Sequence, residues 1–163
     1  MNIKDVLTTL TRLHALCSAS EHAFREAALN AKSISTRILL DMYAGQRAQF
    51  VNELENLLMG MGGNIDDNSQ VMGAYAKRYQ SNTNSLDNLA CLTSGEECFL
   101  GEYTRALLNN LPSSLFIVIR TQLDEAKRLK LQLDRFDDNE IQLYDSVNGD
   151  LTTNNNNYWE LQS

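Results

Sequence analysis

Long stretches of the chain place apolar residues at alternating spacings of three and four, and this pattern constrains the fold most. In an α-helix such spacing puts successive side chains on one face, which then becomes the seam of a helix bundle. The clearest seam contains Leu10, Leu13, Cys17, Ser20, Phe24, Ala27 and Ala31. There is one proline in 163 residues, so little interrupts long helices. The pattern predicts helices over residues 3–31, 36–61, 85–110 and 112–136.

The lengths of the connections predict how these helices are arranged. Short connections make the first and second helices antiparallel, and likewise the third and fourth. About 20 residues separate the second helix from the third, and residues 70–80 are expected to add a short helix there. A 26-residue helix is roughly 39 Å long, a length that such a partly helical segment can cross. Two antiparallel hairpins joined by one long crossover form the ferritin-like arrangement, so we predict an all-α, ferritin-like four-helix bundle.

An internal repeat supports this arrangement. Shifting the chain by 79 positions brings the two hairpins into register without a gap, with Leu13 on Leu92 and Phe24 on Tyr103. The joint register of such matches predicts two hairpins related by a pseudo-twofold axis.

Dimetal proteins of this fold use a Glu from each of two helices and a Glu-x-x-His from each of the other two. The equivalent positions here are Cys17, Gln46, Gln49, Glu96, Glu125 and Arg128. Only Glu96 and Glu125 keep a carboxylate, and neither histidine is present. We therefore predict a buried polar layer with no metal, no other cofactor and no catalytic residue.

Charge balance indicates what replaces a metal in this layer. Two buried carboxylates need a cation or must take up protons. Arg128 lies one turn from Glu125 on the same helical face, so we expect its guanidinium to approach Glu96 or Glu125. A residual metal at the two carboxylates is the alternative.

The C-terminal segment differs from the rest of the chain in charge. All 14 Lys and Arg residues lie within residues 1–136, whereas residues 137–163 carry six acidic residues and a run of asparagines. We predict a bundle over 1–136 and an acidic, Asn-rich tail over 137–163. A nearly neutral bundle with an acidic tail is a poor ligand for nucleic acid.

Apolar residues at the end of the tail and at the start of the last helix are the candidates for binding a partner. Tyr158, Trp159 and Leu161 form an apolar cluster at the end of the tail. Phe116 lies in the run Leu115-Phe116-Ile117-Val118-Ile119, which is apolar on all sides of a helix and is therefore expected to be covered by the tail or by another subunit.

The expected location is the cytoplasm. Lys4 and Asp5 interrupt the N-terminal residues and no apolar segment of the signal-peptide type follows. No apolar stretch is long enough to span a bilayer, so no membrane association is expected. Three cysteines without a Cys-x-x-Cys motif favour reduced thiols.

Several short motifs resemble those of a bacterial family of ferritin-like four-helix bundles, the domain of unknown function 2383. They are Phe24-Arg25-Glu26-Ala27-Ala28, Gln46-Arg47-Ala48-Gln49-Phe50, Met61-Gly62-Gly63, Gly73, Gly95-Glu96 followed by Tyr103, and Leu111-Pro112. The resemblance covers roughly residues 6–136. It implies the fold and no established activity.

The leading functional hypothesis is a non-catalytic helical bundle that acts through its surfaces, as a homodimer or by binding another protein. One alternative is a degenerate ferritin-like iron-binding protein or oxidase that uses Glu96 and Glu125. A second alternative is an acidic inhibitor, of the immunity type, that masks a basic partner such as a toxin.

Overall fold

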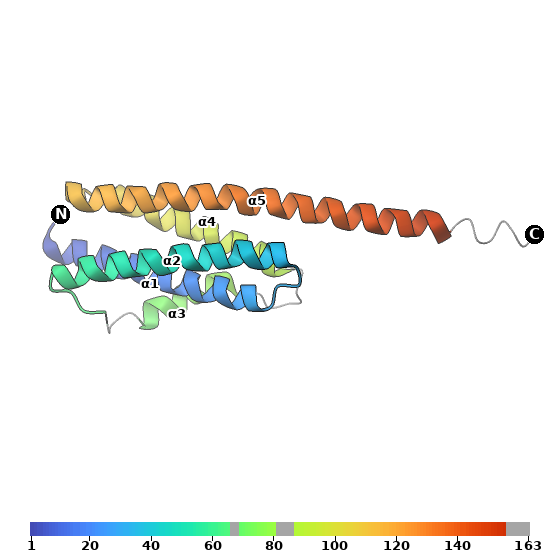
Figure 1. Cartoon of the computed structure of the whole chain (residues 1–163). Helices are drawn as coiled ribbons and strands as arrows, with labels where there is room; N and C mark the ends of the chain where they lie inside the picture. The colour runs from blue at the N-terminus through green and yellow to red at the C-terminus, as the bar shows by residue number, and fades with distance from the viewer. Residues whose placement is uncertain (66–68, 81–86, 156–163) are drawn as a thin grey trace, which may run out of the picture. The chain divides into compact units, whose positions relative to one another are not determined.

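The computed structural model describes residues 1–65, 69–80 and 87–155, and within them the chain is helical, with no strand (Figure 1). The helices are α1 (Ile3–Leu29), α2 (Ile34–Gly60), α3 (Ser69–Tyr79), α4 (Asp87–Leu107) and α5 (Ser113–Asn155). The predicted all-α class is confirmed. None of these helices is both long enough and apolar enough to cross a membrane.

Capping residues explain where α1 and α2 begin. The side chain of Asn2 accepts a hydrogen bond from the backbone N–H of Asp5 at 2.9 Å, and that of Ser33 accepts from Thr36 at 3.1 Å. Both bonds satisfy an N–H that has no partner within its own helix. After α2, Gly62 has a φ of 77°, a backbone conformation that suits glycine.

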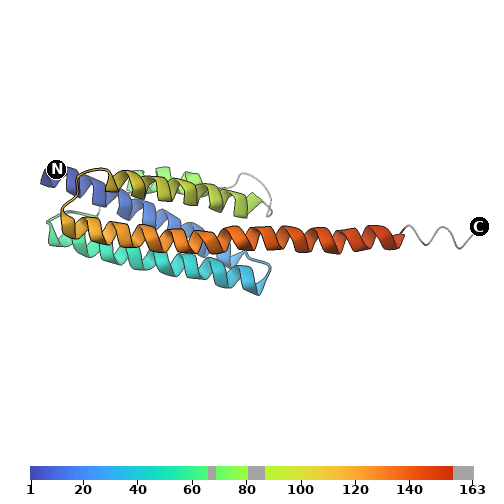
Figure 2. The same ribbon diagram turned by 90° about the horizontal axis from the view of Figure 1, so that it is seen from above.

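The chain divides into two compact units, Met1–Lys130 and Leu131–Ser163. In the first unit α1 and α2 lie side by side and run in opposite directions, and the chain reverses again between α4 and the start of α5 (Figures 1 and 2). The long connection predicted between the second and third long helices is present. It carries α3, which packs against α1 and α4.

Side chains from four helices form the core of the first unit. The predicted seam of α1 faces this core, since Leu10, Leu13 and Phe24 are all buried. Aromatic rings account for much of its volume. The rings of Phe24 and Tyr43 stack with centroids 4.2 Å apart, and Phe99 stacks on the ring of Tyr103 at 4.7 Å. From α5, Leu115, Ile119, Leu123 and Ala126 belong to the same cluster.

The predicted end of the last helix near Phe136 is wrong, because α5 continues to Asn155. Residues 137–155 contain no proline and a single glycine. Extending an existing helix by one residue requires no new nucleus, so a polar composition alone does not stop it. The domain boundary after residue 136 stays a prediction.

Candidate functional site

A buried ion pair lies inside the first unit. Arg47 on α2 and Glu96 on α4 are both inaccessible to solvent, and Nη2 of Arg47 donates a hydrogen bond to Oε2 of Glu96. The guanidinium carbon lies 3.6 Å from the ring centroid of Phe99, which is cation–π distance. The rings of Tyr43 and Phe50 lie 5.6 and 5.7 Å from the same carbon. The cation is therefore held by one carboxylate and several aromatic rings, without contact to solvent.

Tyr79 of α3 completes the surroundings of Glu96. Its hydroxyl donates to Oε1 of Glu96 at 3.2 Å. Burial raises the pKa of Glu96, while the charge of Arg47 and the bond from Tyr79 oppose that rise. The same burial, together with the charge of Glu96, raises the pKa of Tyr79 well above its usual value. Tyr79 is therefore a neutral hydrogen-bond donor at neutral pH.

Gly95 explains why Tyr79 can approach α4 so closely. A Cβ atom at Gly95 would overlap Cδ1 and Cε1 of the Tyr79 ring, closer than real Cβ contacts come. The glycine therefore lets the ring lie against the backbone of α4. This contact places the Tyr79 hydroxyl beside Glu96, the residue that follows Gly95.

A second set of hydrogen bonds leads from the interior towards the surface. The hydroxyl of Tyr103 donates to Oε1 of Gln122 at 2.8 Å, and Nε2 of Gln122 donates to Oε2 of Glu53 at 2.7 Å. Sγ of Cys17 lies 3.1 Å from the Tyr103 oxygen. Because a phenol has one proton and here gives it to Gln122, the Cys17 thiol is the donor in this last contact. Cys17 is thus a protonated member of the network.

The environment of Cys17 predicts low reactivity. Burial raises the pKa of its thiol to about 12, and its side chain has no exposed surface. Cys91 and Cys98 are free and half-buried.

We expect a thiol reagent at about pH 8 to modify Cys91 and Cys98 in the native protein while sparing Cys17, because only thiolates react. Peptide mass spectrometry checks this, with labelling in urea as the control that all three cysteines can react. Equal labelling rates for Cys17 and Cys98 in native protein would contradict it.

The structure brings together only part of the predicted polar layer. Cys17 and Glu96 are both buried. The charge of Arg47 acts to lower the pKa of each, against the effect of burial. Gln46 is half-buried and donates to the backbone oxygen of Glu125 at 3.2 Å. The side chain of Glu125 is half-buried as well. Glutamine and glutamate at these two positions therefore contribute to a contact between α2 and α5.

The prediction for Arg128 is wrong. Its side chain is exposed, as is that of Gln49, which donates to Glu53 at 3.1 Å. Arg47 is the cation that neutralises Glu96. The sequence contained a signal for it, because Arg47 lies four residues after Tyr43 and three before Phe50, on the stripe that those two residues define. Gln46 fits the same stripe by spacing, three residues after Tyr43 and four before Phe50.

The candidates for partner binding differ in how they can be placed. Tyr158, Trp159 and Leu161 lie outside the described residues. Phe116 is 38% exposed on α5. A groove of about 500 Å³ between α2 and α5 is lined by Glu53, Asn56, Leu57, Ile117, Val118 and Thr121, and Phe116 is not part of that lining.

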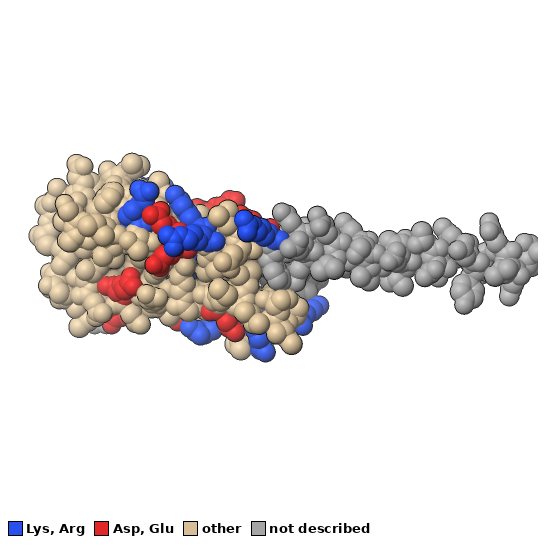
Figure 3. All heavy atoms as spheres, turned by 45° about the horizontal axis from the view of Figure 1, so that its top comes forward, with Lys and Arg blue, Asp and Glu red and all other residues tan. Residues whose placement is uncertain are grey.

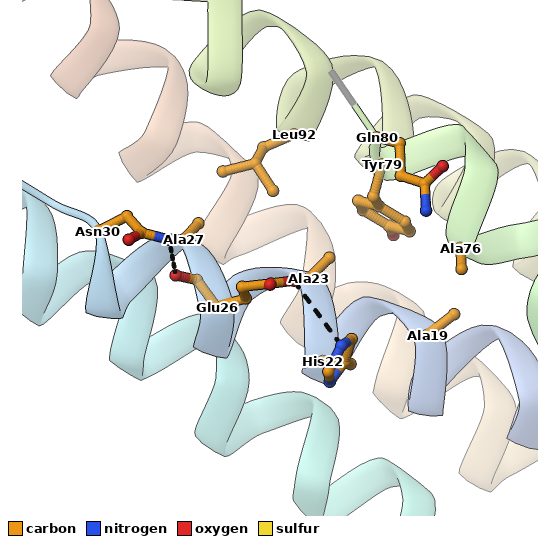
Figure 4. Close-up of a pocket in the computed structure, with 10 residues that line it drawn as sticks. All are labelled: Ala19, His22, Ala23, Glu26, Ala27, Asn30, Ala76, Tyr79, Gln80 and Leu92. Carbon is orange, nitrogen blue, oxygen red and sulfur yellow. Dashed lines mark hydrogen bonds and ion pairs between the residues drawn. The ribbon is translucent and has the colours of Figure 1, made fainter. Parts of the chain in front are cut away.

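A second hollow, of about 290 Å³, lies between α1, α3 and α4 (Figure 4). Its lining includes four alanines, Ala19, Ala23, Ala27 and Ala76. His22 and Glu26 also line it, with Nε2 of the histidine 3.7 Å from Oε2 of the glutamate. Tyr79 lines the same hollow and donates to Glu96, so its side chain stands between the hollow and the buried ion pair.

The residues present do not fit the dimetal site of ferritin-like bundles. Such a site needs carboxylates and imidazoles from four helices. Within residues 1–65, 69–80 and 87–155, no three His, Cys, Asp or Glu side chains are grouped so that they could hold a metal ion. Glu96 already binds a permanent cation, the guanidinium of Arg47, which would repel a metal ion beside it.

Comparison with known proteins identifies the family. A model for a domain of unknown function (DUF2383) matches residues 5–109. This segment contains most of α1 and all of α2 to α4, and therefore Arg47, Tyr79 and Glu96. No curated protein matches the chain. Since the matched segment is well over half of the 163 residues, the chain belongs to the DUF2383 family of domains of unknown function.

Proposed function

We propose that the chain is a non-catalytic helical bundle that acts by binding protein at its surface, either another protein or a second copy of itself. The observation that carries this proposal is the buried ion pair in the interior of the first unit. Glu96 occupies a position where a dimetal bundle has a metal ligand, and here it is paired with Arg47, with no exposed surface on either side chain. A substrate has no access to these groups, whereas apolar side chains such as Ile117 and Met59 are exposed on the outside.

The proposed architecture is the ferritin-like bundle. Support comes from the order of the helices, since α1 and α2 are antiparallel and a long connection carrying α3 precedes α4 and α5 (Figures 1 and 2). The proposed location is the cytoplasm, where free cysteines such as Cys17 stay reduced.

The dimetal alternative is the weaker one. Its two remaining ligands would be Glu96 and Glu125, but Arg47 binds the first of these. The alternative of an acidic inhibitor depends on residues 137–163, whose side chains lie outside the described ones. It predicts a basic partner, and so differs from the main proposal in the partner that would be recovered.

Site-specific photo-crosslinking in the native host tests the proposal. A photoreactive amino acid in place of Phe116, an exposed apolar residue at the start of α5, is expected to form one defined protein adduct. The control has the same amino acid in place of Ile38, which is exposed elsewhere on α2. Mass spectrometry of the adduct identifies the partner and shows whether it is basic. The proposal is wrong if neither position gives an adduct and the purified chain contains stoichiometric iron or manganese.

A further inference from the structure

Helix α3 contributes little to the core of the first unit. The core cluster is made of buried side chains from α1, α2, α4 and α5, and among the described residues only the half-buried Tyr75 of α3 packs against it. Of the 11 residues of α3, all of which the structure describes, Tyr79 alone is buried. The four longer helices can therefore keep their shared core when α3 moves away.

Two tyrosine hydroxyls hold α3 against α4. Tyr79 donates to Oε1 of Glu96 at 3.2 Å, and Tyr75 donates to Oε2 of Glu102 at 3.3 Å. The two tyrosines are four residues apart and so lie on one face of α3. Both distances exceed the usual range of about 2.5–3.0 Å for a bond between hydroxyl and oxygen, so each bond is weak. The ring of Tyr79 also meets that of Phe24 edge-on, with centroids 6.0 Å apart.

The middle of α3 contains a glycine that packing does not require. Gly73 is exposed, and a Cβ atom there would have nothing within 4 Å. Glycine in a helix interior is about fivefold less favourable than alanine, because its backbone has more freedom to lose. A separate helix of this length is also marginal in water. Helix α3 therefore depends on its contacts with α1 and α4 to stay helical.

We infer that α3 is a strap that opens while the four longer helices stay folded, and that its opening exposes Glu96 to solvent. Charged side chains of both signs lie on the face of the closed molecule in Figure 3, whereas Arg47 and Glu96 have no exposed surface. Tyr79 stands between Glu96 and the hollow of about 290 Å³ (Figure 4). When α3 leaves, this hollow extends to the Glu96 carboxylate. The inference goes beyond the proposed binding role and does not depend on it, because the purified chain alone tests it.

Hydrogen exchange of the purified full chain, measured by mass spectrometry, tests whether α3 opens on its own. Its backbone amides are expected to exchange at least about a hundredfold faster than those of α4, yet more slowly than amides of an unfolded peptide. Tyr79→Phe removes the hydrogen bond to Glu96 and should accelerate exchange in α3 about tenfold. Gly73→Ala should slow exchange in α3 about fivefold.

The matched control is Gly45→Ala on α2, where nothing lies within 4 Å of a Cβ atom either. This change stabilises α2, so it should slow exchange in the most protected amides of α2 and α4. It should leave exchange in α3 unchanged, because α2 stays folded while α3 opens. If Gly45→Ala slows exchange in α3 as much as in α4, the inference is overturned, since α3 then opens only when the whole unit unfolds.

An introduced thiol reports whether the opening reaches Glu96. Ser20 has no exposed surface and lies beside Tyr79 and Glu96. The thiol introduced by Ser20→Cys should react with a thiol reagent at a rate that Tyr79→Phe raises and Gly73→Ala lowers. Cys17, one turn earlier on α1 and part of the core cluster, should stay unmodified. The inference is wrong if the thiol at position 20 reacts no faster than that of Cys17.

Discussion

Arg47→Met is expected to lower the free energy of unfolding by about 3–5 kcal/mol near neutral pH, because it leaves Glu96 buried without its cation. Methionine keeps most of the volume of the arginine stem, so the loss is mainly one of charge compensation. The matched control is Arg128→Met, which changes an exposed arginine and is expected to shift the free energy by no more than about 0.5 kcal/mol. Urea unfolding of the two variants and the wild type measures both values.

The loss in free energy of unfolding caused by Arg47→Met should be smaller at acidic pH. Burial raises the pKa of Glu96 above the usual 4.5 even with Arg47 present, and without the arginine the opposing effect is lost. A carboxyl group whose pKa is higher in the folded state takes up a proton on folding. Its contribution to stability is complete below the unfolded pKa and is lost as pH rises through the folded pKa. The variant should therefore approach the wild type as pH falls from neutrality towards 4.5.

A second substitution separates lost charge compensation from lost packing. Arg47→Met/Glu96→Gln removes both charges and keeps a hydrogen-bond acceptor for Tyr79. It should be more stable than Arg47→Met alone, since replacing both partners of a buried pair costs far less than orphaning one. An Arg47→Met variant that is equally unstable at neutral and acidic pH, with no recovery in the double variant, would contradict the role assigned to the ion pair.

Gly95→Ala is expected to destabilise the protein by about 2 kcal/mol, although alanine is the better helix former. The new Cβ would overlap the Tyr79 ring, so the ring, and α3 with it, must move away from Glu96. Gly101→Ala is the control on the same helix. Nothing lies within 4 Å of a Cβ there, and the change should stabilise α4 by about 0.5–1 kcal/mol.

A double variant checks the cause of the Gly95 effect. Tyr79→Ala removes the ring that the new methyl group meets, so adding Gly95→Ala to Tyr79→Ala should be nearly neutral. Urea unfolding provides the four free energies of this cycle. Two results would show that the contact between Gly95 and Tyr79 does not limit stability. One is that the changes in free energy of unfolding of the two substitutions add fully in the double variant, and the other is a Gly95→Ala variant as stable as Gly101→Ala.

The helical class was predictable because the residues that decide it are local in sequence. The spacing of Leu10, Leu13 and Phe24 is enough to define a buried face of α1, and the structure buries all three. The end of α5 was not predictable in the same way. Composition changes after residue 136, but no proline follows and the helix continues to Asn155. A change in composition marks a change of environment, which is a different property from the end of a helix.

The candidate site was only partly predictable, because its contacts join residues that are distant in sequence. Glu96 and Cys17 lie on apolar seams and were expected in the interior on that basis. The sequence offers two arginines near apolar residues, Arg47 on α2 and Arg128 on α5. Neighbouring positions on a helix point about 100° apart, so an error of one position in the assumed buried face of either helix changes which arginine is placed inside. The tertiary structure selects Arg47, through its contacts with Glu96 and Phe99.

The buried ion pair of Arg47 and Glu96 also affects how the stability of the folded chain depends on the composition of the solution. A metal ion that neutralises interior carboxylates is exchanged with the solution, so the stability it confers follows the free metal concentration. Arg47 is part of the chain and is present at the same ratio to Glu96 in every molecule. The balance of charge around Glu96 is thus independent of dilution and of chelators. A bundle built this way stays folded through changes in metal supply, which suits the binding role proposed for this chain.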